Sequence, residues 1–132
     1  MKEYYAGIDV GSTTVKLVIT LNDEIVFGKY ERHRSHTQQT LLALLKDARE
    51  VLGECVLRVK ITGSGGIGLA KALKIGFVQE VVATTSAIRE VAPKTDVAIE
   101  LGGEDAKIIY FDNGVEERMN GVCAGGTGSF ID

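Results

Sequence analysis

Apolar residues alternate with polar or small ones along the first thirty positions, a pattern that predicts three β-strands. The first strand ends at Asp9 and Val10, the second covers residues 15–20 and the third covers residues 25–30. The segment Gly11-Ser12-Thr13-Thr14 separates the first two strands, and its glycine and hydroxyl residues are typical of a tight turn. Successive strands joined by such short turns are expected to form an antiparallel meander.

The hydrophobic period lengthens after this meander and predicts a helix. Ser35-His36-Thr37-Gln38 has the form of a capping box, and Gly53 supplies a stop signal. The apolar residues between them fall on one face at helical spacing, which indicates a helix that faces the core: Leu41, Leu42, Leu44, Leu45, Ala48, Val51 and Leu52. The two histidines just before this helix, His33 and His36, are expected to be surface residues.

A strand and a glycine-rich turn follow. Val56–Thr62 alternates apolar with polar residues, and Gly63-Ser64-Gly65-Gly66-Ile67-Gly68 then satisfies the pattern G-x-G-x-x-G. A dinucleotide-binding fingerprint should open the first βαβ unit, whereas this one follows three strands and a helix, and the next strand candidate, residues 77–79, is very short. We therefore interpret the glycines as a strand-to-helix turn at the mouth of the cleft that the Gly11–Thr14 turn also borders. A further helix is predicted over residues 80–92, ended by Pro93.

The pattern of the opening hairpin occurs a second time. Val97–Leu101 and Ala106–Phe111 are apolar runs on either side of a Gly102-Gly103 turn, and Val115–Met119 predicts a further strand. Three pairs of residues keep one 91-residue offset, namely Asp9 with Glu100, Gly11 with Gly102, and Lys16 with Lys107. A repeat of this length indicates a duplicated domain.

The duplication predicts two lobes. We expect residues 1–95 to form the first lobe and residues 96–132 to form the opening hairpins of a second, truncated lobe. The second copy has strands but no helix to cover them, and such a sheet does not bury enough apolar surface to be stable alone. The alternative to truncation is that the exposed face of this second copy pairs with another molecule.

Each turn combines the residue types that a phosphate group and its metal ion require. Glycine lets the backbone approach an anion, N–H and hydroxyl groups donate to phosphate oxygens, and a carboxylate such as Asp9 or Asp105 can hold a hydrated Mg²⁺. Two such hairpins facing each other would hold the phosphates of a nucleotide from both sides. Taken alone, the first hairpin is equally consistent with an ordinary Gly-Ser-Thr turn beside an exposed carboxylate.

The composition is that of a globular protein, with 45% hydrophobic and 25% charged residues. A net charge of −3 without a run of Lys or Arg gives no reason to expect nucleic acid as a partner. No basic-then-apolar leader and no apolar run of membrane-span length occurs, so we expect a cytoplasmic protein with no membrane partner. Cys55 and Cys123 are too few for a disulfide framework and are expected to be reduced thiols.

Two motifs carry a family resemblance. The residues from Gly7 to Lys16 resemble the first phosphate motif of the ATPase superfamily of actin, Hsp70 and the sugar kinases, and Glu100-Leu101-Gly102-Gly103-Glu104-Asp105 resembles the second. More narrowly, this second motif together with M-N-G-V-C-A-G-G-T-G-S-F-I-D at residues 119–132 resembles the activator ATPases of 2-hydroxyacyl-CoA dehydratases and benzoyl-CoA reductases. The resemblance implies an α/β fold of the ribonuclease-H-like, actin-like type, with a mixed sheet.

The resemblance also implies an ATP site shared by the two motifs. Asp9 and Asp105 would flank the β- and γ-phosphates, holding Mg²⁺ through water and orienting the attacking water, with Glu104 as a further catalytic candidate. Glu104 stands where the activators often have glutamine, so which carboxylate handles the water stays open. The ATP-binding candidates are Gly11, Ser12, Thr13, Thr14, Lys16, Gly102, Gly103 and Lys107. Either lysine could equally point at solvent.

In the superfamily, the helix of residues 80–92 would connect the lobes and approach the nucleotide. The residues that would lie near it are Glu80, Thr84, Thr85 and Ser86. The activators often have a histidine about where Thr84 stands, so this chain departs from them at that point.

Cys123 separates the possible functions. A lone cysteine is ordinarily a buried small hydrophobe, but within N-G-V-C-A-G-G-T-G it resembles the first cluster cysteine of the activators. In that family each subunit of a dimer gives two thiolates to one shared 4Fe-4S cluster, which requires four. The partner cysteine would lie beyond Asp132 and Cys55 does not match it, so this chain is not expected to assemble the cluster properly.

The resemblance implies the N-terminal part of an activator that couples ATP hydrolysis to electron transfer from an iron-sulfur cluster to an acyl-CoA dehydratase or reductase. The full-length protein would be a homodimeric ATPase, and these 132 residues alone would be inactive. Two alternatives stay open. One is a sugar-kinase-like phosphotransferase, although no base aspartate or acceptor pocket is obvious, and the other is a non-catalytic module that binds nucleotide or a partner protein.

Overall fold

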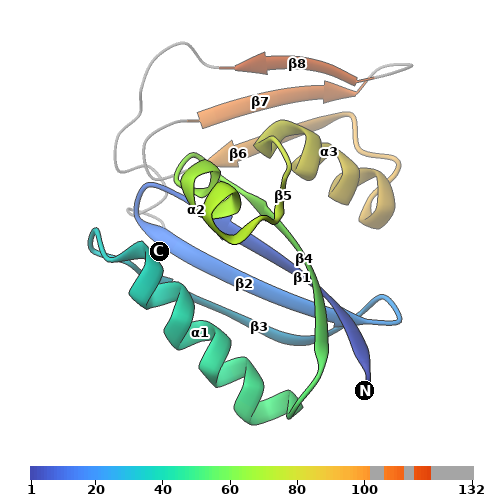
Figure 1. The fold of residues 1–132 in the computed structure, drawn as a ribbon. Coiled ribbons are helices and arrows are strands. Elements are labelled where there is room, and N and C mark those ends of the chain that lie inside the picture. The colour runs from blue at the N-terminus through green and yellow to red at the C-terminus, as the bar shows by residue number, and fades with distance from the viewer. Residues whose placement is uncertain (102–105, 112–114, 120–132) are drawn as a thin grey trace. The chain divides into compact units, whose positions relative to one another are not determined.

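The computed structural model describes residues 1–101, 106–111 and 115–119 of the 132-residue chain (Figure 1). The chain divides into two compact units, Met1–Val78 and Gln79–Asp132. The first unit contains a 5-stranded sheet and the second a 3-stranded sheet. The division into lobes at residues 95 and 96 stays a prediction.

The sheet of the first unit is mixed. Its strands are β1 (Glu3–Val10), β2 (Thr14–Leu21), β3 (Glu24–Arg32), β4 (Val56–Thr62) and β5 (Gly76–Phe77), in the spatial order β3-β2-β1-β4-β5. Strand β2 pairs antiparallel with β1 and β3, whereas β4 runs parallel to β1 and β5. The predicted antiparallel meander is therefore confirmed, and the parallel strands reached through helices give the α/β class.

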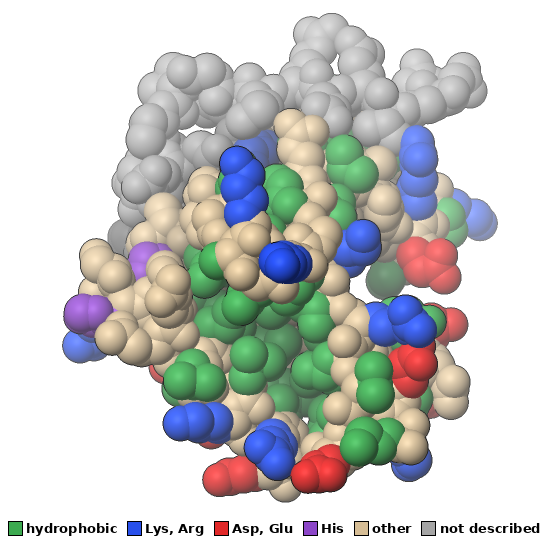
Figure 2. All heavy atoms as spheres, viewed as in Figure 1, with side chains coloured by type: hydrophobic (Ala, Val, Ile, Leu, Met, Phe, Trp, Pro, Cys, Tyr) green, Lys and Arg blue, Asp and Glu red, His purple; other side chains and the backbone are tan. Residues whose placement is uncertain are grey.

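One face of this sheet is buried under helix α1 (Thr37–Leu52). Successive strand residues point to opposite faces, so Ala6, Ile8 and Val10 of β1 share the buried face. The core continues through residues of β2 and α1: Val15, Leu17, Ile19, Leu41, Leu44 and Ala48. Figure 1 shows α1 lying along β2 and β3, and Figure 2 shows hydrophobic side chains gathered beside it.

Helix α1 differs in two respects from the helix that the sequence predicts. The capping box does not form, because His36 is the N-cap residue and no side chain caps the helix. Leu42 is 53% exposed, since it lies about 100° around the helix from buried Leu41, and Val51 in the last turn is 66% exposed. The stop signal is confirmed: Gly53 has a φ of 73° and its N–H donates to the Arg49 carbonyl at 2.8 Å.

The glycine-rich segment joins β4 to helix α2 (Gly66–Leu73), which confirms the predicted strand-to-helix turn. Lys74 is the C-cap residue of α2 and adopts a left-handed conformation with a φ of 57°. The chain then enters β5 at Gly76–Phe77, slightly earlier than the strand predicted at residues 77–79.

A cavity of about 460 Å³ lies beside the C-terminal end of α1. Its lining is largely apolar and includes Ile19, Leu45, Ala48, Leu52 and Leu57. An ion pair between Arg49 and Glu54, at 3.5 Å, contributes its two residues to the same cavity. The parallel strands β1 and β4 begin near this cavity, whereas Asp9 stands near the end of β1, so the predicted phosphate chemistry lies elsewhere.

The second unit contains helix α3 (Glu80–Val91) and an antiparallel sheet of β6 (Val97–Leu101), β7 (Ala106–Phe111) and β8 (Val115–Met119). Helix α3 ends one residue before the predicted end at residue 92. Its buried residues are Val81 and Thr85, and β7 buries Ile109. In the part of the chain that the structure describes, every helix is too short or too polar to cross a membrane.

The two sheets repeat the same register but bury opposite faces. Glu100 pairs with Lys107 across β6 and β7, just as Asp9 pairs with Lys16 across β1 and β2. The buried residues of β1 correspond to exposed residues of β6, which are Val97, Ile99 and Leu101. Lys107 is buried whereas Lys16 is exposed. The reason is that α1 covers the first sheet, whereas α3 contacts the second sheet on the face that carries Glu100 and Lys107.

Leu44→Ala is expected to lower the free energy of unfolding by about 2–5 kcal/mol, because Leu44 is almost fully buried between α1 and the sheet. Urea denaturation followed by circular dichroism measures this change. The matched control is Leu42→Ala on the exposed side of the same helix, for which we expect a change within about 0.5 kcal/mol. Equal losses in the two variants would contradict this assignment of the α1 core face.

Candidate nucleotide-phosphate site

Asp9 stands one residue before the end of β1, opposite Lys16 on β2. The Lys16 Nζ and the Asp9 Oδ2 are 3.8 Å apart, and the two side chains are 53% and 37% exposed, respectively. An ion pair with this exposure contributes little to stability. The carboxylate and the amine therefore stand together at the surface, where both can meet a charged ligand.

A tight turn follows Asp9 and connects β1 to β2. The Gly11 N–H donates to the Thr14 carbonyl at 2.9 Å and so closes the turn. Gly11, Ser12 and Thr13 are half-buried, and Thr14 is buried as the first residue of β2. The predicted hairpin with a Gly-Ser-Thr turn is thus present, with Asp9 directly before it.

His33 contacts this turn from the end of β3. Its backbone N–H donates to the Thr13 carbonyl at 3.0 Å, and its Nε2 lies 3.0 Å from the Gly11 carbonyl oxygen. The side chain is 8% exposed, so the expectation of a surface residue is wrong for His33 and right for His36, which is exposed. Because Thr14 pairs with Arg32, the last residue of β3, the residue that follows it must lie level with the turn. The sequence pattern alone does not reveal this register.

The glycine-rich turn after β4 packs against the same end of β1. The Gly65 N–H donates to the Val10 carbonyl at 2.9 Å. Gly63 has a φ of 98°, and a Cβ there would stand 2.3 Å from the Val10 carbonyl oxygen and 2.6 Å from Asp9 Oδ1. Two loops distant in the sequence therefore meet at Asp9, and only glycine fits at position 63.

In the second unit, α3 is bonded to the sheet at the positions equivalent to Asp9 and Lys16. The Lys107 Nζ donates to Glu80 Oε2 at 2.7 Å, and the Thr84 hydroxyl donates to Glu100 Oε2 at 3.2 Å. The Lys107 side chain is only 5% exposed and that of Glu80 is 30% exposed. A buried amine requires such a carboxylate partner, so Glu80 compensates the charge of Lys107.

Five candidate residues lie outside the residues that the structure describes: Gly102, Gly103, Glu104, Asp105 and Cys123. Their proposed roles stay predictions. The structure does place Asp9, Gly11, Ser12, Thr13, Thr14 and Lys16 together around one turn, as the sequence pattern predicts. Their binding of a nucleotide stays a prediction as well.

Comparison with known proteins identifies one family. The model of the BadF/BadG/BcrA/BcrD ATPase family matches residues 6–132. The 2-hydroxyisocaproyl-CoA dehydratase activator of Clostridioides difficile is 32% identical over 136 aligned positions, covering 98% of this chain and 50% of that protein. The activator of lactoyl-CoA dehydratase of Anaerotignum propionicum is 33% identical, with coverages of 98% and 51%. The chain thus spans about half the length of the relatives it matches.

A solved structure shows the same fold. The activator of the 2-hydroxyisocaproyl-CoA dehydratase from Clostridium difficile, with bound ADPNP, superposes with a TM-score of 0.77 at 29% identity. The alignment covers 98% of this chain and 50% of that one. The predicted actin-like α/β fold is therefore confirmed.

Gly63→Ala is expected to destabilise the first unit by more than about 1–2 kcal/mol, the cost of a left-handed backbone for a residue with a Cβ, because the added carbon also clashes with Val10 and Asp9. The thermal unfolding midpoint measures this effect. The control is Gly68→Ala within α2, where a Cβ meets no atom within 4 Å and alanine favours the helix. An equal midpoint in the two variants would show that the contact at position 63 is not tight.

Proposed function

This chain belongs to the BadF/BadG/BcrA/BcrD ATPase family, and we propose that it is the N-terminal part of an ATP-hydrolysing activator of an acyl-CoA dehydratase or reductase. In the whole protein, ATP hydrolysis is coupled to electron transfer from a 4Fe-4S cluster to that partner enzyme. The observation that carries the proposal is the meeting of Asp9, Lys16 and a glycine-hydroxyl turn at the end of β1 in a chain of an ATPase family. The names of the two relatives as dehydratase activators support the choice of partner.

Asp9 and the first turn bind the phosphates in this proposal. Mg²⁺ usually keeps several waters and takes one or two carboxylates together with substrate phosphates. The partly exposed carboxylate of Asp9 fits such a role, since it has room for a hydrated ion. Gly11 lets the backbone approach the phosphates, Ser12, Thr13 and Thr14 supply backbone N–H groups and hydroxyls to phosphate oxygens, and Lys16 adds a positive charge. The Gly11 N–H bonds within the turn, so Ser12 and Thr13 are the main donors.

The second copy supplies the other half of the proposed site. Asp105 holds Mg²⁺ through water, Glu104 or Asp105 orients the attacking water, and Gly102 and Gly103 donate to phosphate oxygens. Lys107 is included because it repeats Lys16 at the same register position. Its amine donates to Glu80, and because an ammonium group has three N–H donors, this bond does not by itself prevent a contact with a phosphate.

Cys123 provides one of the thiolates for the cluster, and the proposal places a second beyond residue 132. Four thiolates are required, so two subunits share one cluster in a homodimer. The cluster supplies the one-electron chemistry, while the residues of this chain bind and position the nucleotide. The proposed location is the cytoplasm.

Asp9→Asn is expected to lower the ATPase kcat/KM of the protein extended to its natural C-terminus on the order of 10²-fold, because the charge that holds Mg²⁺ is lost. A coupled assay of phosphate release measures this value. Asp23→Asn, in the turn between β2 and β3, is the control and should leave the rate unchanged, since asparagine tolerates its φ of 65°. Full activity in Asp9→Asn would remove Asp9 from the proposed site.

Cys123→Ser is expected to remove the iron of the same protein, purified without oxygen, while ATP hydrolysis persists. The measurement is iron and acid-labile sulfide per dimer, with about four of each expected in the wild type. The absence of iron from the wild type, together with transfer of phosphate to a small alcohol, would contradict the activator and favour the sugar-kinase alternative. Nucleotide binding without hydrolysis would favour the non-catalytic module.

A further inference from the structure

His33 joins both ends of the turn that carries the proposed phosphate donors. Its backbone N–H is bonded to the Thr13 carbonyl and its ring Nε2 to the Gly11 carbonyl, each at 3.0 Å. The turn is also closed by the bond from the Gly11 N–H to the Thr14 carbonyl. The residue that follows β3 therefore restrains two carbonyls of the turn, those of Gly11 and Thr13, and it does so from a buried position.

The hydrogen bonds of the imidazole determine its protonation state. The Ser35 N–H donates to His33 Nδ1 at 3.0 Å, so Nδ1 must offer a lone pair. A carbonyl oxygen can only accept, so Nε2 must carry the proton that it shares with Gly11. Only the neutral ring protonated on Nε2 satisfies both partners.

The conformation of the loop after β3 points the Ser35 N–H toward the His33 ring. Arg34 and Ser35 have φ values of 46° and 68°, a left-handed conformation that is unfavourable for residues with a side chain. The His36 N–H donates to the His33 carbonyl at 2.7 Å and closes this loop. Such backbone strain persists only where surrounding contacts hold it. Here the bond from the Ser35 N–H to His33 Nδ1 is one of these contacts, and the same bond holds the His33 ring in place.

The bond to Gly11 also orients the next amide. In a trans peptide the carbonyl of one residue and the N–H of the next lie in one plane and point in opposite directions. Because the Gly11 carbonyl points to His33, the Ser12 N–H of the same peptide points away from His33. The Ser12 N–H is one of the main donors in the proposed phosphate site, so His33 determines the direction in which this donor points.

We propose that His33, as a neutral imidazole protonated on Nε2, is a positioning residue that aims the Ser12 amide at a nucleotide phosphate. This inference rests on the proposed ATPase function and adds a specific role for a residue outside the phosphate motif. His33 itself does not contact the nucleotide. Its effect passes through the peptide between Gly11 and Ser12.

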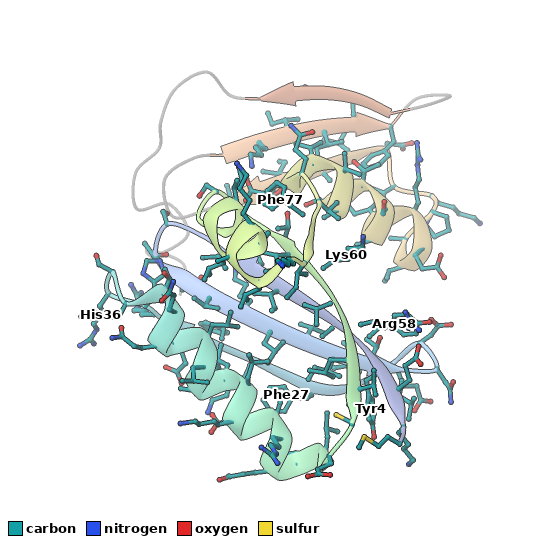
Figure 3. The ribbon with its side chains drawn as sticks, viewed as in Figure 1. Tyr4, Phe27, His36, Arg58, Lys60 and Phe77 are labelled. Atoms are coloured by element: carbon teal, nitrogen blue, oxygen red, sulfur yellow. The ribbon has the colours of Figure 1, made fainter. Side chains whose placement is uncertain are left out.

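The test uses the protein extended to its natural C-terminus and three variants. His33→Leu removes the donor and retains bulk, whereas His33→Gln retains a side-chain N–H that can reach the Gly11 carbonyl. His36→Leu is the control, because His36 is exposed and Figure 3 shows it on the loop before α1. We measure kcat and KM for MgATP and the thermal unfolding midpoint of each protein.

His33→Leu is expected to raise the KM for MgATP about tenfold, the effect of losing one well-oriented hydrogen bond to a charged group, with a smaller change in kcat. His33→Gln should restore most of the affinity, and His36→Leu should match the wild type. An unchanged KM in a folded His33→Leu protein would overturn the inference. So would equal KM values for the leucine and glutamine variants, because a merely structural role would not depend on the donor.

Nitrogen NMR of ¹⁵N-histidine-labelled protein tests the tautomer directly, with the His33 signals assigned by their loss in His33→Gln. A proton on Nε2 supports the inference, and a proton on Nδ1 overturns it. If His33→Leu does not fold, this measurement and the KM of the glutamine variant decide whether His33 has the proposed positioning role. Absence of ATP hydrolysis by the wild type would overturn the proposed function itself, whereas failure of the His33 variants in an active protein overturns only this inference.

Discussion

The antiparallel pairing of β2 with both β1 and β3 is the constraint on which the candidate site depends. In this register Asp9 faces Lys16, and Thr14 faces Arg32. The turn after β1 and the loop after β3 therefore lie at the same end of the sheet, and His33 can reach the turn. A slip of one residue would move every side chain to the other face, which would expose the core and separate these groups.

The hairpins β1–β2 and β6–β7 have the same register but are covered by helices on opposite faces. The first sheet buries the face that α1 covers, which leaves Asp9 partly exposed and Lys16 exposed on the other face. In the second sheet α3 contacts the face of Glu100 and Lys107, so the lysine is buried and paired with Glu80. Equivalent residues in a repeat therefore differ in chemistry because helices cover opposite faces, although the strand register is identical.

The end of β1 is tightly packed by backbone rather than by large side chains. The loop after β4 approaches Val10 so closely that Gly63 has no room for a Cβ. On the other side, His33 restrains the turn through two carbonyl groups. Contacts from two loops give a turn of small residues a defined shape, which is what a set of backbone donors needs in order to recognise an anion.

Much of this fold and part of the site follow from local sequence. Strand alternation, helical spacing and glycine stop signals predict the meander, the helices and the hairpin around Asp9, because each depends on residues close together in the chain. The family resemblance rests on short motifs and is confirmed over residues 6–132. The tertiary structure alone decided that Lys107 is buried while Lys16 is not, and that His33 is a buried residue bonded to Gly11. These differences depend on the helix that covers each sheet and on the register between strands, which are contacts between distant residues that no local pattern encodes.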